Sequence, residues 1–290
     1  MVNYLLNISN FALIYIILAT SSHLLIRVSN QISLGQAAFF GIGAYITALC
    51  TQVFHLPIIP SLLIVMLVNG VIAYLIAMPT VKLVGDYFVM ATLAFQFIVF
   101  SILYNWTSVT GGSEGISGIP SPKLFGIDSI SANLDFFILN LVLTLILLFL
   151  FYKLQYSMYG KVLKALHINE LSLLATGRDT RKIRISVFVI SSAFIGWGSY
   201  LYATYMSYID PSSFNIHESI FILIAVLLGS SEKIRGVVIG AAFMILLPEI
   251  LRFVQIPDTI AAPINQIILG ILLLFIVYFR GNSLFSNQST

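Results

Sequence analysis

Long apolar segments fill most of this 290-residue sequence and alternate with short polar stretches. A helix of about 20 apolar residues is long enough to cross the hydrocarbon core of a bilayer. The apolar segments lie at residues 5–26, 33–52, 58–78, 86–104, 134–152, 185–206, 219–230, 236–252 and 263–280. The sequence therefore predicts an all-α, polytopic membrane protein, with about nine transmembrane helices in a single domain over residues 1–290.

The composition agrees with a membrane protein and excludes other classes. Hydrophobic residues make up 59% of the chain and charged residues only 9%, so the chain lies well outside the usual balance of soluble domains. No room is left for a soluble catalytic domain. The net charge of +3 is concentrated in one loop, so it does not indicate binding to nucleic acid. Cys50 is the only cysteine, so no intramolecular disulfide can form.

One hydrophilic stretch, residues 153–184, which we call the basic loop, interrupts the apolar segments. Basic residues in short loops stay on the cytoplasmic side, so this loop is predicted to face the cytoplasm. Alternating crossings then place the N-terminus outside, the C-terminus inside, and residues 105–133 in a long outer loop. Seven of the 14 basic residues lie in the basic loop: Lys153, Lys161, Lys164, Arg178, Arg181, Lys182 and Arg184.

The basic loop has the pattern of two short amphipathic helices. Apolar residues recur at roughly helical spacing from Val162 to Leu174, and Asn169 interrupts them. Gly177 stands where the second helix is expected to end. Two roles fit this pattern: a docking surface for a cytoplasmic partner, or a basic surface that rests on anionic lipid headgroups.

The segment 219–230 is short for a crossing, because twelve helical residues span only about 18 Å. Its helix either continues through Glu232 and Lys233 or is a half-helix. A re-entrant segment would reverse every later crossing and place Arg280 outside, so the charge pattern favours a full crossing.

The outer loop, residues 105–133, is rich in glycine and proline, which excludes a helix through this part. Its length beside much shorter neighbouring loops favours contact with a partner over a plain connection.

Small residues recur on one face of the second apolar segment. This face predicts close packing against another helix. Gln36 points off the face, and Thr92 with Gln96 forms a polar stripe on a later segment. These three residues are candidates for a polar pathway, while hydrogen bonding between helices is the alternative explanation. The small face consists of Ser33, Ala37, Gly41, Ala44 and Ala48.

No catalytic or metal-binding motif stands out. The four histidines have no metal-ligand spacing, and Gly229–Lys233 lacks the order of a phosphate-binding loop. Gly115–Gly118 has the GxSG pattern of intramembrane serine proteases, but Ser117 lies in a polar loop rather than in an apolar helix. The chain is therefore not expected to be an enzyme, and no catalytic residue, metal or cofactor is expected in it.

Five stretches carry more specific signatures: Ser33–Tyr45, Gly85–Phe95, Asn105–Pro120, Gly160–Gly177 and Pro211–Ile220. Together they resemble the permease subunits of bacterial ABC importers for branched-chain amino acids, most closely the M-type subunit of the permease pair. The chain departs from that family at Phe97 and Phe100, where the family often has an acidic and a basic residue. The glycine-rich turn at Gly229–Val237 is also altered. Urea and short amides, carried by related permeases, therefore stay open as substrates.

The resemblance implies that the basic loop is a coupling loop whose short helix fits a groove in a separate ATPase subunit. It also implies a homologous second permease subunit, two ABC ATPases that bind the ATP, and an external substrate-binding protein, in a bacterial inner membrane. A stand-alone secondary transporter or channel is the alternative, but the spans hold almost no coupling-ion residues. The matching loop positions are Gly160, Lys161, Lys164, Ala165, Glu170, Ala175 and Gly177.

Overall fold

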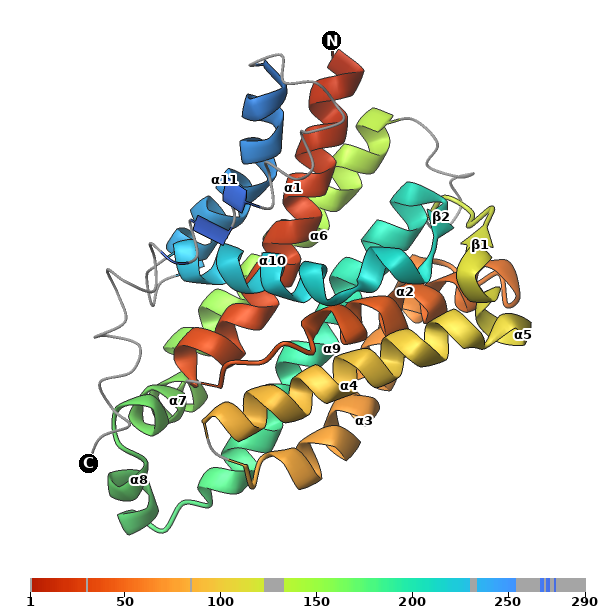
Figure 1. Cartoon of the computed structure of the whole chain (residues 1–290). Coiled ribbons are helices and arrows are strands. Elements are labelled where there is room, and N and C mark those ends of the chain that lie inside the picture. The colour runs from red at the N-terminus through yellow and green to blue at the C-terminus, as the bar shows by residue number, and fades with distance from the viewer. Residues whose placement is uncertain are drawn as a thin grey trace.

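The computed structural model describes residues 2–29, 31–83, 85–122, 133–229, 234–253, 267–268, 270–271 and 274. Helices dominate these residues, as predicted (Figure 1). The long helices are α1 (Val2–His23), α2 (Gln36–Gln52), α3 (Ile58–Thr80), α4 (Asp86–Asn105), α6 (Asn133–Tyr156), α9 (Thr180–Met206) and α11 (Ile234–Phe253). The shorter helices are α5 (Thr107–Thr110), α7 (Met158–Ile168), α8 (Glu170–Ala175) and α10 (Ile216–Leu228).

Five further elements lie in the described part of the chain. A π-helical segment, Leu24–Val28, continues α1, and 3₁₀ turns lie at Gly112–Glu114 and Pro211–Phe214. Strands β1 (Ile116–Ser117) and β2 (Tyr208–Ile209) form an antiparallel pair. The all-α prediction therefore misses one small two-stranded sheet.

Five helical stretches are long and apolar enough to cross a membrane, among the residues that the structure describes. They are Asn3–Val28, Ile58–Thr80, Asp86–Asn105, Asn133–Tyr156 and Thr180–Met206. Helices α2 and α10 are shorter, at 17 and 13 residues. The predicted segment 263–280 lies mostly outside the described residues. A polytopic helical protein is thus confirmed, while the predicted number of crossings is not.

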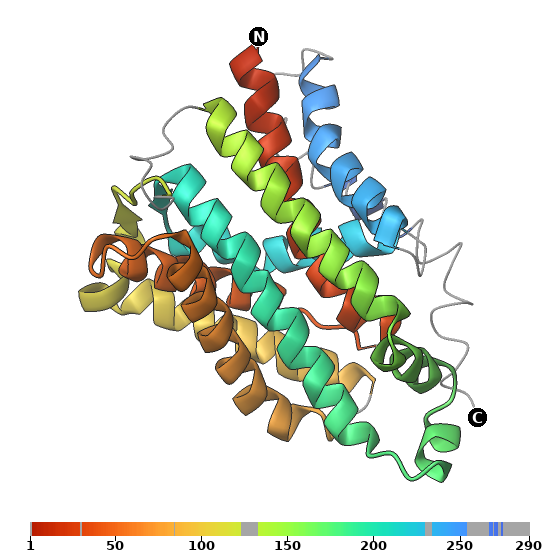
Figure 2. The same ribbon diagram turned by 180° about the vertical axis from the view of Figure 1, so that it is seen from behind.

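The long helices α1, α6 and α9 run between opposite ends of the molecule (Figures 1 and 2). At one end, Gln52 Nε2 donates to the Ser117 carbonyl at 2.7 Å, which joins the end of α2 to β1. At the other end, Arg181 Nη2 donates to the Met78 carbonyl at 3.2 Å, which joins the start of α9 to the end of α3. Helices α7 and α8 lie at this second end, far from β1 and β2.

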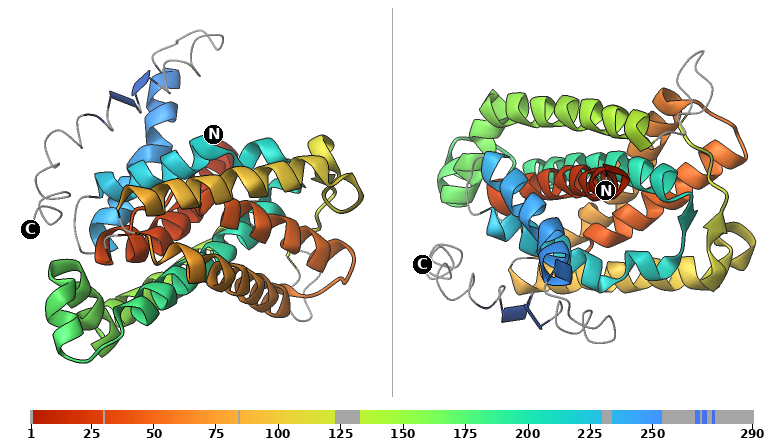
Figure 3. Two further views of the ribbon diagram at one scale, coloured as in Figure 1. Left: turned by 60° about the horizontal axis from the view of Figure 1, so that its bottom comes forward. Right: turned by 90° about the horizontal axis from the view of Figure 1, so that it is seen from above.

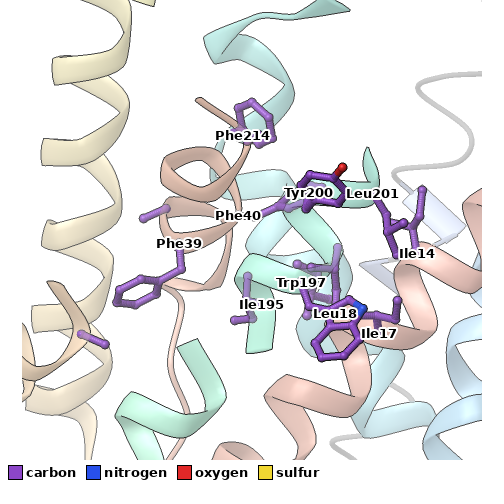
Figure 4. Close-up of a cluster of buried hydrophobic side chains, with 14 of the residues drawn as sticks. Ile14, Ile17, Leu18, Phe39, Phe40, Ile195, Trp197, Tyr200, Leu201 and Phe214 are labelled. Carbon is purple, nitrogen blue, oxygen red and sulfur yellow. The ribbon is translucent and has the colours of Figure 1, made fainter. Parts of the chain in front are cut away.

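Helix α9 lies in the centre of the bundle and packs against α1, α2 and α3. In the view from above, α1 and α9 lie between α6 and α4 (Figure 3). Large buried side chains from α1, α2 and α9 meet there (Figure 4). Phe40 contacts Phe214 and Tyr202 edge to face, with ring centroids 5.1 and 5.0 Å apart. Such aromatic contacts fix the position of α2 against α9.

All five residues of the small face are buried, but the first of them, Ser33, lies outside α2. Ala37, Gly41, Ala44 and Ala48 are all buried within α2. Ser33 is also buried but lies before the helix, because α2 starts at Gln36 with Gly35 as its N-cap. The Ser33 hydroxyl instead accepts a hydrogen bond from the Gly35 N–H at 3.2 Å, so it stabilises the turn that leads into the helix.

Two predicted loop boundaries are corrected by the structure. Helix α6 continues to Tyr156 and α9 starts at Thr180, so both ends of the basic loop are helical. Glycine does not exclude helix from the whole outer loop, because the one-turn helix α5 forms just before the glycines begin. Residues 123–132 of the outer loop lie outside the described residues.

Candidate functional site

Helix α7, the first helix of the basic loop, starts directly after α6. Ser157 is its N-cap, and the Ser157 hydroxyl accepts from the Gly160 N–H at 3.3 Å. Gly160 lies so close to the end of α6 that an added Cβ would lie 2.1 Å from the Gln155 carbonyl oxygen. Leu163 and Leu166 are buried beneath the helix. This packing fixes α7 across the end of α6.

Helix α8 follows after a single extended residue and ends in an open turn. Asn169 breaks the helical path with φ −157°, as the sequence predicted. The Gly177 N–H donates to the Leu174 carbonyl at 2.9 Å, and Gly177 has a φ of +78°. Glycine adopts this left-handed conformation without the penalty that other residues incur. Within the described part of the chain, no atom lies within 4 Å of an added Gly177 Cβ, so this turn projects away from the helices around it.

Two side-chain contacts attach the basic loop to α9. The Tyr159 hydroxyl lies 2.7 Å from Ser186 Oγ. Arg184 forms a two-point ion pair with Glu170, with Nη2 to Oε2 at 2.7 Å and Nε to Oε1 at 3.3 Å. Partial burial alone would raise the pKa of the Glu170 carboxyl, but the hydrogen bond and charge of Arg184 bring it below its ordinary value. The carboxyl is therefore ionised throughout the neutral range.

Glu170→Gln should loosen the basic loop without unfolding the chain. The ion pair is partly exposed, so its loss costs below about 1 kcal/mol. Trypsin cleavage after Arg178 in the detergent-purified chain should become several-fold faster. The pKa of Glu170 is lower in the folded chain than in the unfolded chain. The ion pair therefore stabilises the folded chain fully above the unfolded pKa, and this stabilisation is lost only as the pH falls through the folded pKa. Wild-type cleavage corrected for protease activity should thus not vary between about pH 6 and 8.

Glu114→Gln, at an exposed carboxylate near β1, is the control. Equal cleavage of the Glu170→Gln and Glu114→Gln variants would contradict the role of the ion pair in holding the basic loop.

The predicted loop positions fall into two groups in the structure. Gly160 is buried, and Lys164 and Glu170 are half-buried; Gly160 and Glu170 make the attachment contacts described above. The others are exposed, as are Ile168 and Leu174 in the same helices, whose side chains are 71% and 47% exposed. Exposed residues that mix basic and apolar groups are suited to contact with another protein or with lipid. The exposed predicted positions are Lys161, Ala165, Ala175 and Gly177.

A second set of polar groups, which we call the polar cluster, surrounds the start of α2. Thr92 Oγ1 accepts from the Leu34 N–H at 3.1 Å. Ser219 Oγ accepts from the Ala37 N–H at 2.9 Å and donates to Gln96 Oε1 at 3.3 Å. Thr92, Gln96 and Ser219 are all buried. Side chains from α4 and α10 thus bind the Leu34 N–H just before α2 and the Ala37 N–H in its first turn, which no helical carbonyl can satisfy.

The polar cluster joins two of the three predicted pathway residues and adds one that sequence reasoning missed. Thr92 and Gln96 share a face of α4, as predicted. Ser219 was missed because nothing in its local sequence indicates a contact with residues more than 120 positions earlier. Gln36 is 1% exposed, and its Oε1 has no hydrogen-bond partner in the described part of the chain. Helix-to-helix hydrogen bonding accounts for Thr92 and Gln96, and a role in transport stays a prediction.

Within the described residues, no three histidine, cysteine, aspartate or glutamate side chains are grouped so that they could hold a metal ion. Ser117, the serine of the GxSG pattern, is exposed in β1, and its carbonyl accepts from Gln52. A nucleophile of an intramembrane protease needs burial and a histidine base. The exposed position of Ser117 does not provide this environment.

The model of the family described as branched-chain amino acid transport system / permease component matches residues 4–277. The chain belongs to this family. The resemblance inferred from the five signature stretches is thereby confirmed. The match covers every described helix from α2 to α11, including the basic loop and the polar cluster of this permease.

Named relatives agree with the family. The permease is 30% identical over 268 residues to the high-affinity branched-chain amino acid transport system permease protein LivM of Escherichia coli and to that of Salmonella typhimurium. Each alignment covers 85% of this chain and 63% of the relative, so the chain spans less than two thirds of their length. A probable LivM permease from Methanocaldococcus jannaschii is 26% identical over 236 residues, covering 78% of this chain and 68% of the relative. No solved structure gives a significant match.

Proposed function

We propose that this chain is one permease subunit of an ATP-driven ABC importer for branched-chain amino acids in a bacterial cytoplasmic membrane. Family membership and the names of the relatives support this assignment. The observation that carries it is the geometry of the basic loop. Helices α7 and α8 are fixed to α6 and α9, while Lys161, Ala165 and Gly177 are exposed.

A loop of this design can transmit movement. An ATPase that binds these exposed residues would push α7 and α8, and the two contacts to α9 would pass the displacement to a long helix. Closure of an ATPase pair on ATP would then rock packed helices between two arrangements, a hinge or shear change. The chain itself contributes no catalytic residue in this mechanism, and the partner ATPases hold the ATP.

The complete importer needs several partners. We assign to it a homologous second permease subunit, two ABC ATPases and an external substrate-binding protein that docks near β1 and β2. Large apolar side chains are exposed along α3 and α6, including Leu67 at 65% and Phe149 at 65%. These faces would contact membrane lipid and the second permease. No nucleic acid takes part.

Nine crossings, with the N-terminus outside and the C-terminus inside, fit this proposal. Consecutive helices run between the two ends of the molecule, and Arg27, Lys164 and Arg181 lie at the same end. The positive-inside rule makes this the cytoplasmic end. The short α10 counts as one of these crossings, because it ends near the cytoplasmic end. There its Leu227 carbonyl accepts a hydrogen bond from Arg27 Nη2 at 3.3 Å.

Gly177→Trp tests the docking assignment sharply. The indole has room in the isolated chain, because no atom of the described residues lies within 4 Å of the Gly177 Cβ, but it would obstruct a docked ATPase. Leucine uptake by the intact importer should fall at least about tenfold, as expected when a bulky group disrupts an interface. The ATPase should no longer co-purify with the tagged chain in mild detergent, while the amount of chain in the membrane stays close to wild type.

Val53→Trp is the matched control, because Val53 is 62% exposed at the opposite end of the molecule. It adds the same side chain and should leave ATPase co-purification unchanged. Normal ATPase binding and uptake by Gly177→Trp would contradict the docking assignment. Uptake of urea or acetamide, without uptake of leucine, would instead support the alternative that the substrate is urea or a short amide.

A further inference from the structure

A pocket of about 40 Å³ lies at the inner end of the molecule, where α7 meets the π-helical end of α1. We call it the inner pocket. Among the residues that the structure describes, its lining consists of Arg27, Val28, Lys164, His167 and Ile168. Three of these five side chains are basic, and none is acidic. The chemistry of the lining therefore favours an anionic group.

The inner pocket lies close to the level of the lipid headgroups. Tyr152 and Tyr156, on the last turns of α6, are 56% and 58% exposed, and their ring centroids lie 4.6 Å apart. Exposed tyrosines at the end of an apolar helix mark the interface between membrane and water. Helix α7 starts at Met158, two residues after Tyr156, so it lies along this interface.

The lining of the inner pocket is amphipathic. Val28 is 5% exposed, whereas Ile168 is 71% exposed. A ligand with a charged head and an apolar tail can contact the basic groups and the exposed isoleucine together. Basic pockets between transmembrane helices on the cytoplasmic side commonly bind anionic lipid headgroups.

We propose that the inner pocket binds the phosphate group of one anionic phospholipid of the inner leaflet. Arg27 and Lys164 donate hydrogen bonds to the phosphate oxygens, and His167 borders them. Arg27 also donates to the Leu227 carbonyl of α10. The lipid therefore binds at the junction of α1, α7 and α10. This site goes beyond the importer assignment; only its place in the inner leaflet rests on the proposed orientation.

The test measures lipid retention rather than transport. The purified chain, with whatever subunits accompany it, is exchanged into a detergent with equal amounts of phosphatidylglycerol and phosphatidylcholine and examined by native mass spectrometry. Wild type should retain one phosphatidylglycerol preferentially. Each basic residue near the headgroups contributes about a fivefold gain in affinity, so Arg27→Gln with Lys164→Gln should bind about 25-fold more weakly.

The controls separate a specific pocket from general charge. Lys161→Gln with Arg178→Gln removes one lysine and one arginine from exposed positions outside the pocket, and it should retain the lipid as wild type does. Lys164→Gln alone keeps the bond from Arg27 to α10 and should weaken binding about fivefold. Equal retention by wild type and the pocket variant, or equal loss in the charge-matched control, would overturn the proposal. Displacement of the lipid by an equal concentration of inorganic phosphate would assign the site to soluble phosphate and overturn the lipid assignment.

Discussion

Gly160→Ala is expected to abolish most uptake by the importer while leaving the chain inserted in the membrane. The added Cβ would lie 2.1 Å from the Gln155 carbonyl oxygen and 2.6 Å from the Leu154 carbonyl oxygen. Backbone atoms at the end of a helix cannot move aside as a flexible side chain can, so α7 has to shift. That shift breaks the cap that Ser157 forms with the Gly160 N–H. Overpacking of this kind costs about 1–3 kcal/mol.

Gly160→Ala should impair coupling to the ATPase more strongly than it impairs folding of the chain. Helix α7 carries exposed residues that we assign to contact with the ATPase, whereas the long helices keep their own contacts. We expect leucine uptake below about a tenth of wild type, the size of effect that misplacement by about 1 Å produces at a functional contact. ATPase co-purification should be reduced in parallel.

Gly177→Ala is the matched control for Gly160→Ala. It adds the same methyl group in the same loop, where no described residue has an atom within 4 Å. Its only penalty is the left-handed conformation, about 1 kcal/mol. Most uptake should survive. If the two alanine variants behaved alike, contact of Gly160 with the end of α6 would not explain the result.

Gly43→Ala should have the second large effect, on the stability of the bundle itself. An added Gly43 Cβ would lie 2.5 Å from Ser199 Oγ and 2.7 Å from Ser199 Cβ, so α2 and α9 have to separate. Both residues are buried in the centre of the molecule. A cost of about 1–3 kcal/mol should lower the melting temperature in detergent by several degrees. Thermal size-exclusion measurements can detect this change.

Gly70→Ala provides a control with the opposite sign. Gly70 is also a buried helical glycine that faces α9, but its added Cβ would lie 3.7 Å from Ala193 Cβ and Val189 Cγ1. That distance is ordinary van der Waals contact. Alanine favours the helix over glycine by about 1 kcal/mol, so Gly70→Ala should leave the melting temperature unchanged or raise it. A drop for both variants would mean that close approach is not what Gly43 provides.

Local signals in the sequence predicted the basic loop well. A break at Asn169 and a helix end near Gly177 depend on neighbouring residues alone, and the structure has both. The predicted start of α2, at Ser33, was wrong, because the helix begins at Gln36. Its spacing of small residues extends back to Ser33, but hydrogen bonds from Leu34 and Ala37 to distant side chains let the helix begin later.

Contacts between distant segments could not be predicted from periodicity. Gly43 was missed because it lies off the small face through Gly41 and Ala44, and only the position of Ser199 shows why it must be small. The pairing of Ile116 with Ile209 was missed because a two-residue strand has no repeating pattern to detect. Both contacts appear only once α9 is placed beside α2 and the outer loop.

Helix α9 is attached at both ends to surfaces that we assign to other proteins. Its inner end holds the basic loop through Ser186 and Arg184, and its outer end leads into β2, which pairs with β1. Twenty-seven helical residues form a rod about 40 Å long, so a tilt of about 5° about one end moves the other by about 3.5 Å. A small thrust from the ATPases could therefore reach the outer surface as a displacement the size of an atomic contact. Substrate delivery at one end and nucleotide binding at the other would then both act on the tilt of α9.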